Sequence, residues 1–154
     1  MTQLQIEAPN EKQKQFLLGR CRHIAYGGAR GGGKSWAVRT KAKLLALRYP
    51  GIKLLIVRKS LRELQNNHID PLRRELAGIA GYRAGDRQFV FPNGSTITFG
   101  YCASDSDTGQ YQGAEYDVVF LDEAGQLQKS WIDAINACVR GTNGLPKRTY
   151  YTLN

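Results

Sequence analysis

A glycine-rich segment, AYGGARGGGKSWAVR at residues 25–39, is the feature that most constrains how this chain can fold. Glycine loses more conformational entropy on folding than any other residue and adds no side chain to a core, so packing does not explain five glycines in residues 27–33. The segment fits the pattern G-x-x-x-x-G-K-[ST], in which backbone N–H groups surround a phosphate at the start of a helix. The residues of the pattern are Gly28, Ala29, Arg30, Gly31, Gly32, Gly33, Lys34 and Ser35.

Strand-like and helix-like segments alternate on both sides of this loop. Short apolar runs predict strands at 23–27, 52–59, 116–124 and 148–154, and longer patterns predict helices at 9–19, 34–48 and 130–140. We expect Asn10 and Ser130 to open the first and last of these helices, and Asp70-Pro71 to begin another. Residues 88–100 alternate around Asn93-Gly94, which predicts a β-hairpin. The order predicts one α/β domain with a mainly parallel sheet and the hairpin as an insertion.

Length and composition fit this prediction. A chain of 154 residues with 42% hydrophobic residues is the size of one globular domain. Its longest apolar runs, at 54–57 and 118–121, are far shorter than the roughly 20 residues that span a bilayer, so we expect no membrane segment. Three cysteines without C-x-x-C spacing argue against a zinc site or a disulfide framework. We therefore expect buried thiols and a reducing cytoplasm.

The net charge of +9 is distributed unevenly. Residues 12–62 contain fourteen Lys or Arg and no Asp or Glu, whereas residues 88–154 contain seven acidic residues and four basic ones. Basic blocks of this kind attract polyanions such as nucleic acids. The alternative is that these charges solvate helix faces or serve a bound nucleotide, and charge alone does not separate the two.

Lys34 and Ser35 of this loop, together with Asp122 and Glu123 later in the chain, predict a nucleotide site. Lys34 is placed to bridge the β- and γ-phosphates, and the Ser35 hydroxyl to ligate Mg²⁺. Asp122 follows four apolar residues at the end of a predicted buried strand, where it would hold Mg²⁺ through water. Glu123 comes next and is placed to orient and deprotonate an attacking water. A glutamate acting on water favours hydrolysis over a P-loop kinase, which must exclude water.

The motifs GGARGGGKS, FPNGSTITF, YDVVFLDEA and TLN, in this order and spacing, resemble the N-terminal ATPase domain of the large terminase subunit of tailed double-stranded DNA bacteriophages. The resemblance covers most of the chain from about Pro9 to Asn154. It implies a RecA-like P-loop ATPase fold of the ASCE type. The nucleotide motifs are generic to a wide ATPase superfamily, whereas the arginine inside the phosphate loop and the Asn-Gly-Ser hairpin are more particular to terminases.

The resemblance also implies roles for single residues. KQKQF is similar to the adenine-contacting motif, which indicates Gln13, with Gln15 as the alternative. Arg30 matches the phosphate-loop arginine, a candidate γ-phosphate sensor. Thr152 and Asn154 match the coupling motif beside the γ-phosphate.

One position departs from the family pattern. Some terminases carry an arginine shortly before the acidic strand that reaches into a neighbouring subunit, but Gln112 stands there in this chain. Arg140 and Arg148 are unranked alternatives for that arginine. The sequence also stops inside the last motif, so we expect a fragment that lacks the nuclease domain, and no nuclease activity from this chain.

The resemblance implies Mg-dependent ATP hydrolysis that drives duplex DNA into a procapsid. The implied partners are double-stranded DNA, the portal protein and the small terminase subunit, in the host cytoplasm at the portal. We expect a monomer in isolation and a homo-oligomeric ring when assembled. The alternatives are a helicase-like nucleic-acid translocase, a P-loop kinase and a nucleotide-gated binding module with negligible turnover.

Four polar residues receive no catalytic role from the sequence. His23 and His68 lack partners at ligand spacing, so we expect structural or surface roles for them. Asp105 and Asp107 have the chemistry to bind a cation, but a polar loop is the simpler expectation.

Overall fold

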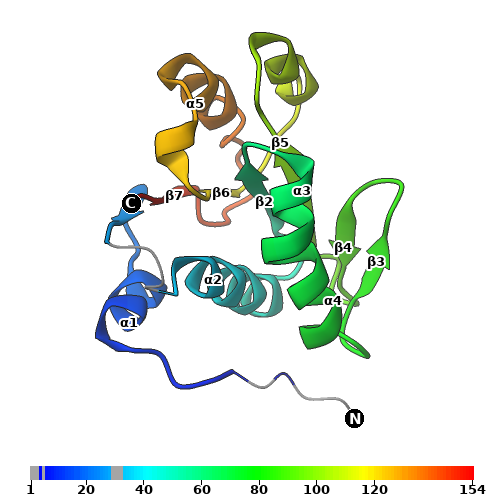
Figure 1. Cartoon of the computed structure of the whole chain (residues 1–154). Coiled ribbons are helices and arrows are strands. Elements are labelled where there is room, and N and C mark those ends of the chain that lie inside the picture. The colour runs from blue at the N-terminus through cyan, green and yellow to red at the C-terminus, as the bar shows by residue number, and fades with distance from the viewer. Residues whose placement is uncertain (1–3, 5, 29–32) are drawn as a thin grey trace.

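The fold is a single sheet with helices on both faces, as Figure 1 shows for this computed structural model. It describes residue 4, residues 6–28 and residues 33–154. The sheet has seven strands in the order β1-β7-β6-β2-β5-β4-β3. The strands are β1 (His23–Tyr26), β2 (Lys53–Arg58), β3 (Gly81–Arg83), β4 (Gln88–Val90), β5 (Thr96–Tyr101), β6 (Val118–Leu121) and β7 (Arg148–Thr152). The helices are α1 (Glu11–Leu18), α2 (Lys34–Arg48), α3 (Leu61–Leu64), α4 (Asp70–Glu75) and α5 (Lys129–Asn136).

The first five strands of this order are parallel, so their carboxyl ends meet at one edge of the sheet. β2 and β6 lie at its centre, and every residue of both except Lys53 is buried. Continuous apolar runs are typical of parallel strands because helices cover both faces. The predicted α/β fold with a mainly parallel sheet is thereby confirmed.

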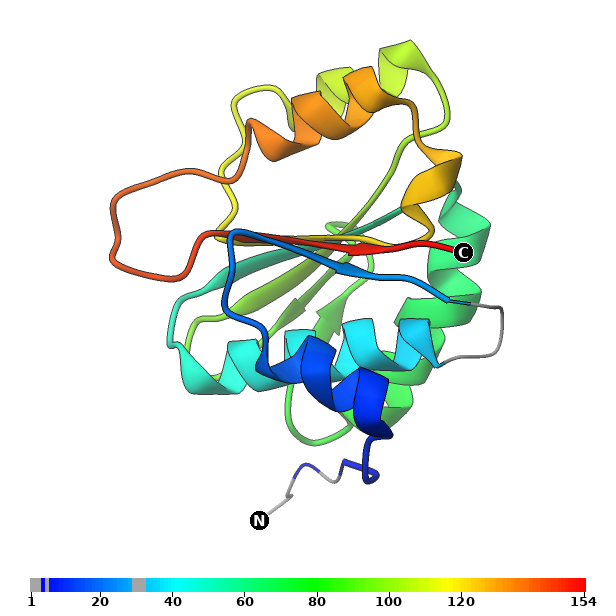
Figure 2. The ribbon, with the colours of Figure 1, turned by 90° about the vertical axis from the view of Figure 1, so that its left-hand side faces the viewer.

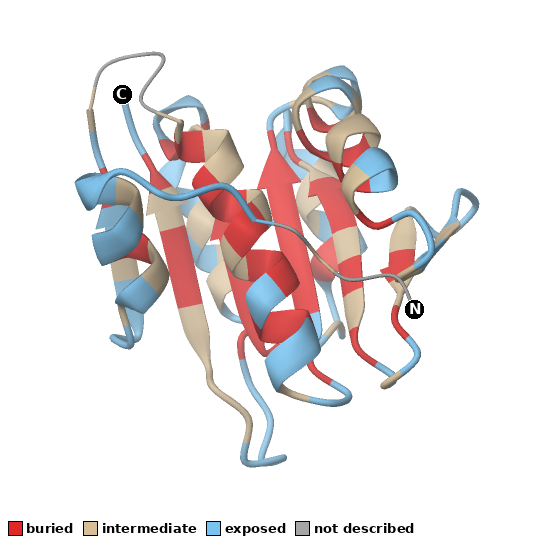
Figure 3. Cartoon of the chain, turned by 90° about the horizontal axis from the view of Figure 1, so that it is seen from below, coloured by how far each residue is buried: buried red, intermediate tan, exposed pale blue. Residues whose placement is uncertain are grey.

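The two faces of the sheet form two separate cores, visible as two layers in Figure 2. Leu54 and Ile56 of β2 face α1, α2 and the helical segment 61–75, and Leu55 and Val57 face α5. The buried residues in Figure 3 follow the middle of the strands and the inner side of α2. Successive residues of a strand point to opposite faces, so one buried strand supplies side chains to both cores.

The predicted hairpin is present. β4 and β5 pair antiparallel, and the turn between them places Gly94 at a φ of 87°, a conformation that favours glycine. β5 also pairs with β2 in parallel, so the hairpin extends the central sheet. The sequence did not predict β3, the edge strand of three residues that pairs with β4.

The helix predicted to begin at Asp70-Pro71 begins ten residues earlier. Ser60 is its N-cap, and α3, a π-helical turn (Gln65–Ile69) and α4 follow without a break. Pro71 has no backbone N–H for the carbonyl of Asn67, four residues before it, and that carbonyl accepts a hydrogen bond from Arg39 Nη1 at 2.5 Å instead. The proline is tolerated inside the helix because a side chain from α2 satisfies the released carbonyl.

Three smaller expectations also have outcomes. Asn10 caps α1 as predicted, but α5 begins at Lys129 after Gln128, so Ser130 lies inside its first turn. Cys102 and Cys138 are buried, whereas Cys21 is exposed in the link between α1 and β1, so the expectation of three buried thiols is wrong. Within the described residues no helix has the length and apolar content needed to cross a membrane.

Candidate active site

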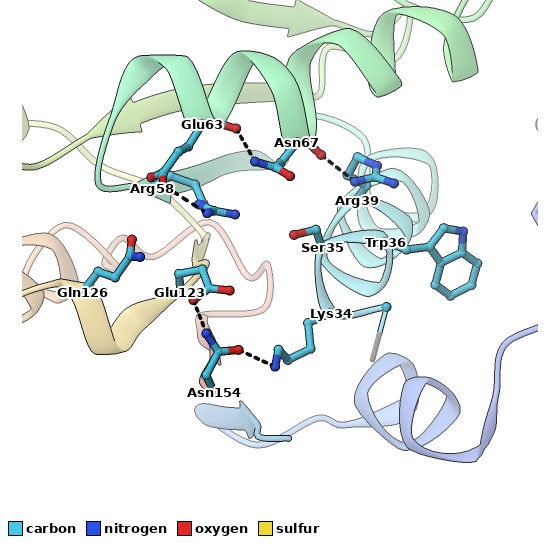
Figure 4. A pocket seen from close by; sticks show the side chains of 11 residues that line it. Lys34, Ser35, Trp36, Arg39, Arg58, Glu63, Asn67, Glu123, Gln126 and Asn154 are labelled. Carbon is cyan, nitrogen blue, oxygen red and sulfur yellow. Dashed lines mark hydrogen bonds and ion pairs between the residues drawn. The ribbon is translucent and has the colours of Figure 1, made fainter. Parts of the chain in front are cut away.

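A pocket of about 430 Å³ lies where the carboxyl ends of the parallel strands meet the start of α2. Figure 4 shows its lining side chains, which come from segments far apart in the sequence. They are Gly33, Lys34, Ser35, Trp36, Arg39, Arg58, Glu63, Asn67, Glu123, Gln126 and Asn154. The sheet order explains the convergence, because β7, β6 and β2 are adjacent and each ends at this edge.

Lys34 is held at the base of the pocket. Its Nζ donates to the Gly28 carbonyl at 2.7 Å and to Asn154 Oδ1 at 2.8 Å. Asn154 Nδ2 in turn donates to Glu123 Oε2 at 2.7 Å, so an amide connects the lysine with the glutamate (Figure 4). The phosphate-loop lysine, the coupling-motif asparagine and the candidate general base therefore form one hydrogen-bonded chain.

Asp122 accepts hydrogen bonds from four side chains. Its Oδ2 accepts from Ser35 Oγ at 3.0 Å, Arg58 Nη1 at 3.0 Å and His68 Nε2 at 2.7 Å. Its Oδ1 accepts from the Thr152 hydroxyl. Burial alone would raise the pKa of Asp122, but the hydrogen bonds from His68 and Thr152 and the charge of Arg58 outweigh burial and hold that pKa far below its usual value. Asp122 is therefore an anion at neutral pH.

Glu123 has a left-handed backbone, with φ 56° and ψ 50°. Its N–H donates to Thr152 Oγ1 at 2.8 Å, and the same hydroxyl donates to Asp122, so one threonine fixes both acidic residues. A non-glycine residue in this conformation costs roughly 1–3 kcal/mol and persists only where its surroundings impose it. Here the strand end turns sharply and directs the Glu123 side chain into the pocket.

The residues of the pocket fit a magnesium–nucleotide complex. Ser35 Oγ and Asp122 Oδ2, 3.0 Å apart, are hard oxygen donors of the kind that Mg²⁺ accepts together with water and phosphate oxygens. Gly33 is the N-cap of α2 and has a φ of 72°. It has no side chain that could accept hydrogen bonds from the first backbone N–H groups of the helix. Those N–H groups and Lys34 suit a phosphate.

The two candidate adenine-contacting residues lie in different places. Gln13 Nε2 donates to the Gly33 carbonyl at 3.2 Å, and Gln13 Oε1 accepts from the Asn10 backbone N–H in a capping box. Gln13 therefore links the start of α1 to the phosphate loop. Gln15 lines a neighbouring pocket of about 250 Å³ between α1 and β1. The adenine contact stays a prediction for Gln13 and for its alternative, Gln15.

Residues 25–153 match the family described as the large terminase subunit, T4likevirus-type, N-terminal. The chain belongs to this family. In the sequence the match spans the glycine-rich motif, Asp122, Glu123 and Thr152.

Solved terminase structures share the fold. The large terminase of a thermophilic bacteriophage in complex with ADP superposes with a TM-score of 0.76 at 17% identity, over 96% of this chain and 39% of that chain. The large terminase of bacteriophage HK97 gives 0.72 at 17% identity, over 97% and 34%. The ATPase domain of Thermus phage P74-26 large terminase gives 0.72 at 18% identity, over 95% and 64%. This terminase domain thus spans well under half of the first two of these chains, and no curated protein sequence matches it.

Four of the predicted loop residues, Ala29, Arg30, Gly31 and Gly32, lie outside the described residues. Gln112, where some terminases carry an intersubunit arginine, is exposed. The alternatives Arg140 and Arg148 lie at the opposite edge of the sheet from the pocket. Arg140 is 3.6 Å from Glu115, and Arg148 donates to the Tyr150 hydroxyl.

The sequence missed Arg58 and His68 as parts of the site. His68 is fully buried, and burial lowers its pKa despite the contact with Asp122, so a neutral imidazole donates from Nε2. A structural or surface role for His68 was expected, but not a contact with Asp122. Arg58 carried a detectable signal in the sequence, because it comes at the end of an apolar run as Asp122 does. In the structure the two runs are neighbouring strands, and Asp122 N–H donates to the Val57 carbonyl. Nothing in the sequence singles out His68.

The remaining polar candidates are structural. His23 Nδ1 lies 2.8 Å from the Tyr151 hydroxyl at the surface. Asp105 accepts from Trp131 Nε1 at 2.7 Å, and Asp107 accepts from the Ala103 N–H at 2.8 Å. Both aspartates therefore hold a 3-10 helical turn (Asp105–Tyr111) in place, as the polar-loop expectation required.

Proposed function

We propose that this terminase domain hydrolyses ATP with Mg²⁺ and that hydrolysis drives duplex DNA into a viral procapsid. The observation that carries the proposal is the chain from Lys34 through Asn154 to Glu123, set beside the Ser35–Asp122 pair. In this proposal Lys34 is the cation that binds phosphate, Ser35 and Asp122 supply two oxygens to the metal, and Glu123 is the carboxylate that acts on water. The related terminase of the thermophilic bacteriophage binds ADP and ATP-gamma-S in its solved complexes, which supports a nucleotide in this pocket.

Each residue has a distinct task in hydrolysis. Lys34 and the N-terminus of α2 neutralise phosphate charge, and Ser35 and Asp122 hold the metal, which supplies further charge stabilisation. Glu123 orients the attacking water and accepts its proton. Asn154, hydrogen-bonded to both Lys34 and Glu123, is placed to pass a change at the phosphate to the end of β7.

Translocation requires partners outside this domain. We propose that the assembled motor is a homo-oligomeric ring at the portal in the host cytoplasm, with the small terminase subunit as a further partner, and that the isolated domain is a monomer. It would grip duplex DNA through phosphates, because a motor must move over any sequence. The basic residues between 12 and 62 support this. We attribute no nuclease activity to the domain, and plasmid nicking that depends on its own residues would contradict this.

Two substitutions test the ATPase site. Lys34→Ala removes phosphate binding, so we expect loss of ATP affinity and of turnover. Glu123→Gln keeps the shape of the side chain and its contact with Asn154, so we expect Mg-ATP to bind with near wild-type affinity and turnover to stop. Binding is measured by titration and turnover by phosphate release. A Glu123→Gln variant that hydrolyses ATP at the wild-type rate would defeat the assignment, and one that still phosphorylates an acceptor would favour a kinase.

A rate measurement tests the assembled site. An arginine that neutralises charge on the transferring phosphoryl group raises rates by about 10³–10⁵. Because Gln112 replaces the intersubunit arginine of some relatives, we expect slow turnover by the monomer and faster turnover on a portal. Arg30 is the alternative source of this charge within one chain. Specific activity that is high and independent of concentration, while sedimentation shows only monomer, would leave Arg30 as the sole arginine.

A further inference from the structure

Arg58 shares one carboxylate oxygen with the candidate metal site. Its Nη1 lies 3.0 Å from Asp122 Oδ2, the oxygen that also accepts from Ser35 Oγ. Arg58 and Asp122 are buried, with 7% and 1% of their surfaces exposed. A guanidinium stays charged at all relevant pH values, so the ion pair persists. It occupies Asp122 Oδ2, the oxygen that a metal ion would need.

A metal ion and this guanidinium conflict at the same oxygen. Two positive charges a few ångströms apart repel strongly where water is excluded, and a carboxylate oxygen with three hydrogen-bond donors has little capacity for another ligand. Of the three donors to this oxygen, Ser35, Arg58 and His68, only the guanidinium of Arg58 carries a fixed positive charge. A cation that approaches Ser35 and Asp122 is therefore repelled chiefly by Arg58.

Glu63 offers Arg58 a second position. Arg58 Nη2 lies 3.6 Å from Glu63 Oε1, longer than a good hydrogen bond. Among the described residues, Arg58 Nε and Glu63 Oε2 are both buried without a hydrogen-bond partner. Figure 4 shows the two side chains next to each other on one side of the pocket, joined by a dashed line. A small rotation of the guanidinium would convert one long contact into a paired arginine–carboxylate contact and satisfy both atoms.

We propose that Arg58 is a resident counter-cation of Asp122 that moves to Glu63 when a magnesium–nucleotide complex enters the pocket. Arg58 acts through Asp122, so it is a positioning residue. It orients the carboxylate before the nucleotide binds, and its departure would make Oδ2 accessible to the metal. The proposal rests on the proposed function, because it takes the pocket to bind Mg-nucleotide.

Nucleotide affinity with and without magnesium tests the exchange. Fluorescence titration of the full chain with N-methylanthraniloyl-ADP gives Kd in excess Mg²⁺ and in EDTA, and the ratio of the two measures how much the metal helps. Arg58→Gln removes the competitor, so we expect the metal to help more, by roughly tenfold. Glu63→Gln weakens the second position of Arg58, so we expect the metal to help severalfold less. If Arg58 has only a structural role, Arg58→Gln does not increase the effect of Mg²⁺ on nucleotide affinity. The ratio of the two Kd values would then be unchanged or smaller in both variants, and the proposal would be overturned.

Arg39→Gln is the matched control. Arg39 lines the same pocket and is held by the Asn67 carbonyl and Glu75, without a hydrogen bond to Asp122. Its loss removes a similar charge, so we expect the magnesium ratio to change far less than in Arg58→Gln. An equal increase in both variants would show a general charge effect and overturn the proposal.

A structure of the wild-type chain with Mg²⁺ and ADP provides a test that needs no variant. We expect the contact between Arg58 and Asp122 to be broken and Arg58 to pair with both oxygens of Glu63. An Arg58–Asp122 contact that persists beside a bound metal would overturn the proposal. If the wild-type chain binds no ADP, the proposed function itself fails, whereas ADP binding with an unchanged ratio in Arg58→Gln rejects only the exchange.

Discussion

Two buried aspartates flank the same strand and do different things. Asp117 precedes β6 and Asp122 follows it, with 2% and 1% of their surfaces exposed. Hydrogen bonds lower the pKa of both carboxyl groups against the effect of burial. Both carboxyl groups are buried and both have a lowered pKa, so burial and the direction of the pKa shift do not show which of them belongs to the pocket.

Their partners distinguish them. Asp117 accepts from the Lys53 N–H at 2.9 Å and from Asn143 Nδ2 at 2.9 Å, and Lys147 Nζ lies 2.8 Å away. These groups tie the start of β2 and the loop before β7 to the sheet. Asp122 instead contacts Ser35 of the phosphate loop and lies beside Glu123 at the pocket. In open α/β sheets ligands bind at the carboxyl ends of the parallel strands, which is where Asp122 lies. Asp117 lies at the amino ends, where its contacts are structural.

The largest difference should appear in turnover. Asp122→Asn removes a charge from the metal site, so we expect ATP turnover to fall by about 10²-fold or more. Asp117→Asn acts at the far edge and should leave turnover within about threefold at a temperature where the variant is folded. Phosphate release at saturating Mg-ATP measures both. Comparable losses of turnover would mean that the amino edge also contributes to catalysis.

Stability should reveal the role of Asp117. Replacing it with Asn leaves Lys147 without its buried anion and weakens two hydrogen bonds, so we expect the free energy of unfolding to fall by about 1–3 kcal/mol. Lys147→Met, which removes the cation and keeps an apolar stem, should cost less. Urea unfolding followed by circular dichroism checks both values. An Asp117→Asn variant as stable as the wild type would show that the loop holds without this anion.

Of the two ends of β6, the pocket end has the strained backbone, at Glu123. Glu123→Gly and Glu123→Ala both remove the carboxylate and should both stop turnover. The positive φ of Glu123 favours glycine, so we expect Glu123→Gly to be more stable than Glu123→Ala by about 1 kcal/mol. Thermal unfolding compares the two variants under identical conditions. Equal stability would mean that Thr152 and Asn154 do not impose the conformation.

Acid should weaken the protein through both aspartates. A carboxyl group with a lower pKa in the folded state stabilises the protein above its unfolded pKa of about 4, and this contribution is lost as the pH falls below that value. We therefore expect the free energy of unfolding to decrease below about pH 4, and Asp117→Asn and Asp122→Asn each to make the decrease less steep. Urea unfolding between about pH 2 and 6 measures the slopes. A steeper slope in either variant would contradict the direction of its pKa shift.

Local sequence determined much of this protein. The loop pattern predicted the positions of Lys34 and Ser35 at the start of a helix. The continuous apolar runs predicted β2 and β6, because such runs are typical of parallel strands that are buried on both faces. Asn93-Gly94 fixed a turn because glycine accepts a positive φ. Asp70-Pro71 misled, since a local signal for a helix start does not reveal that Arg39, 28 residues away from Asn67, satisfies the carbonyl that the proline leaves free.

Only the tertiary structure decided what surrounds Asp122 and Glu123. The sheet order sets β2 and β7 on either side of β6, which brings Arg58 and Thr152 to Asp122 across 64 and 30 residues of sequence. No local pattern states which strands are neighbours, because that depends on the packing of whole helices against both faces. His68 reaches the same carboxylate from a helix for the same reason. The sequence therefore predicted which groups form the candidate site, and the packing of distant segments decided which charged and polar side chains contact them.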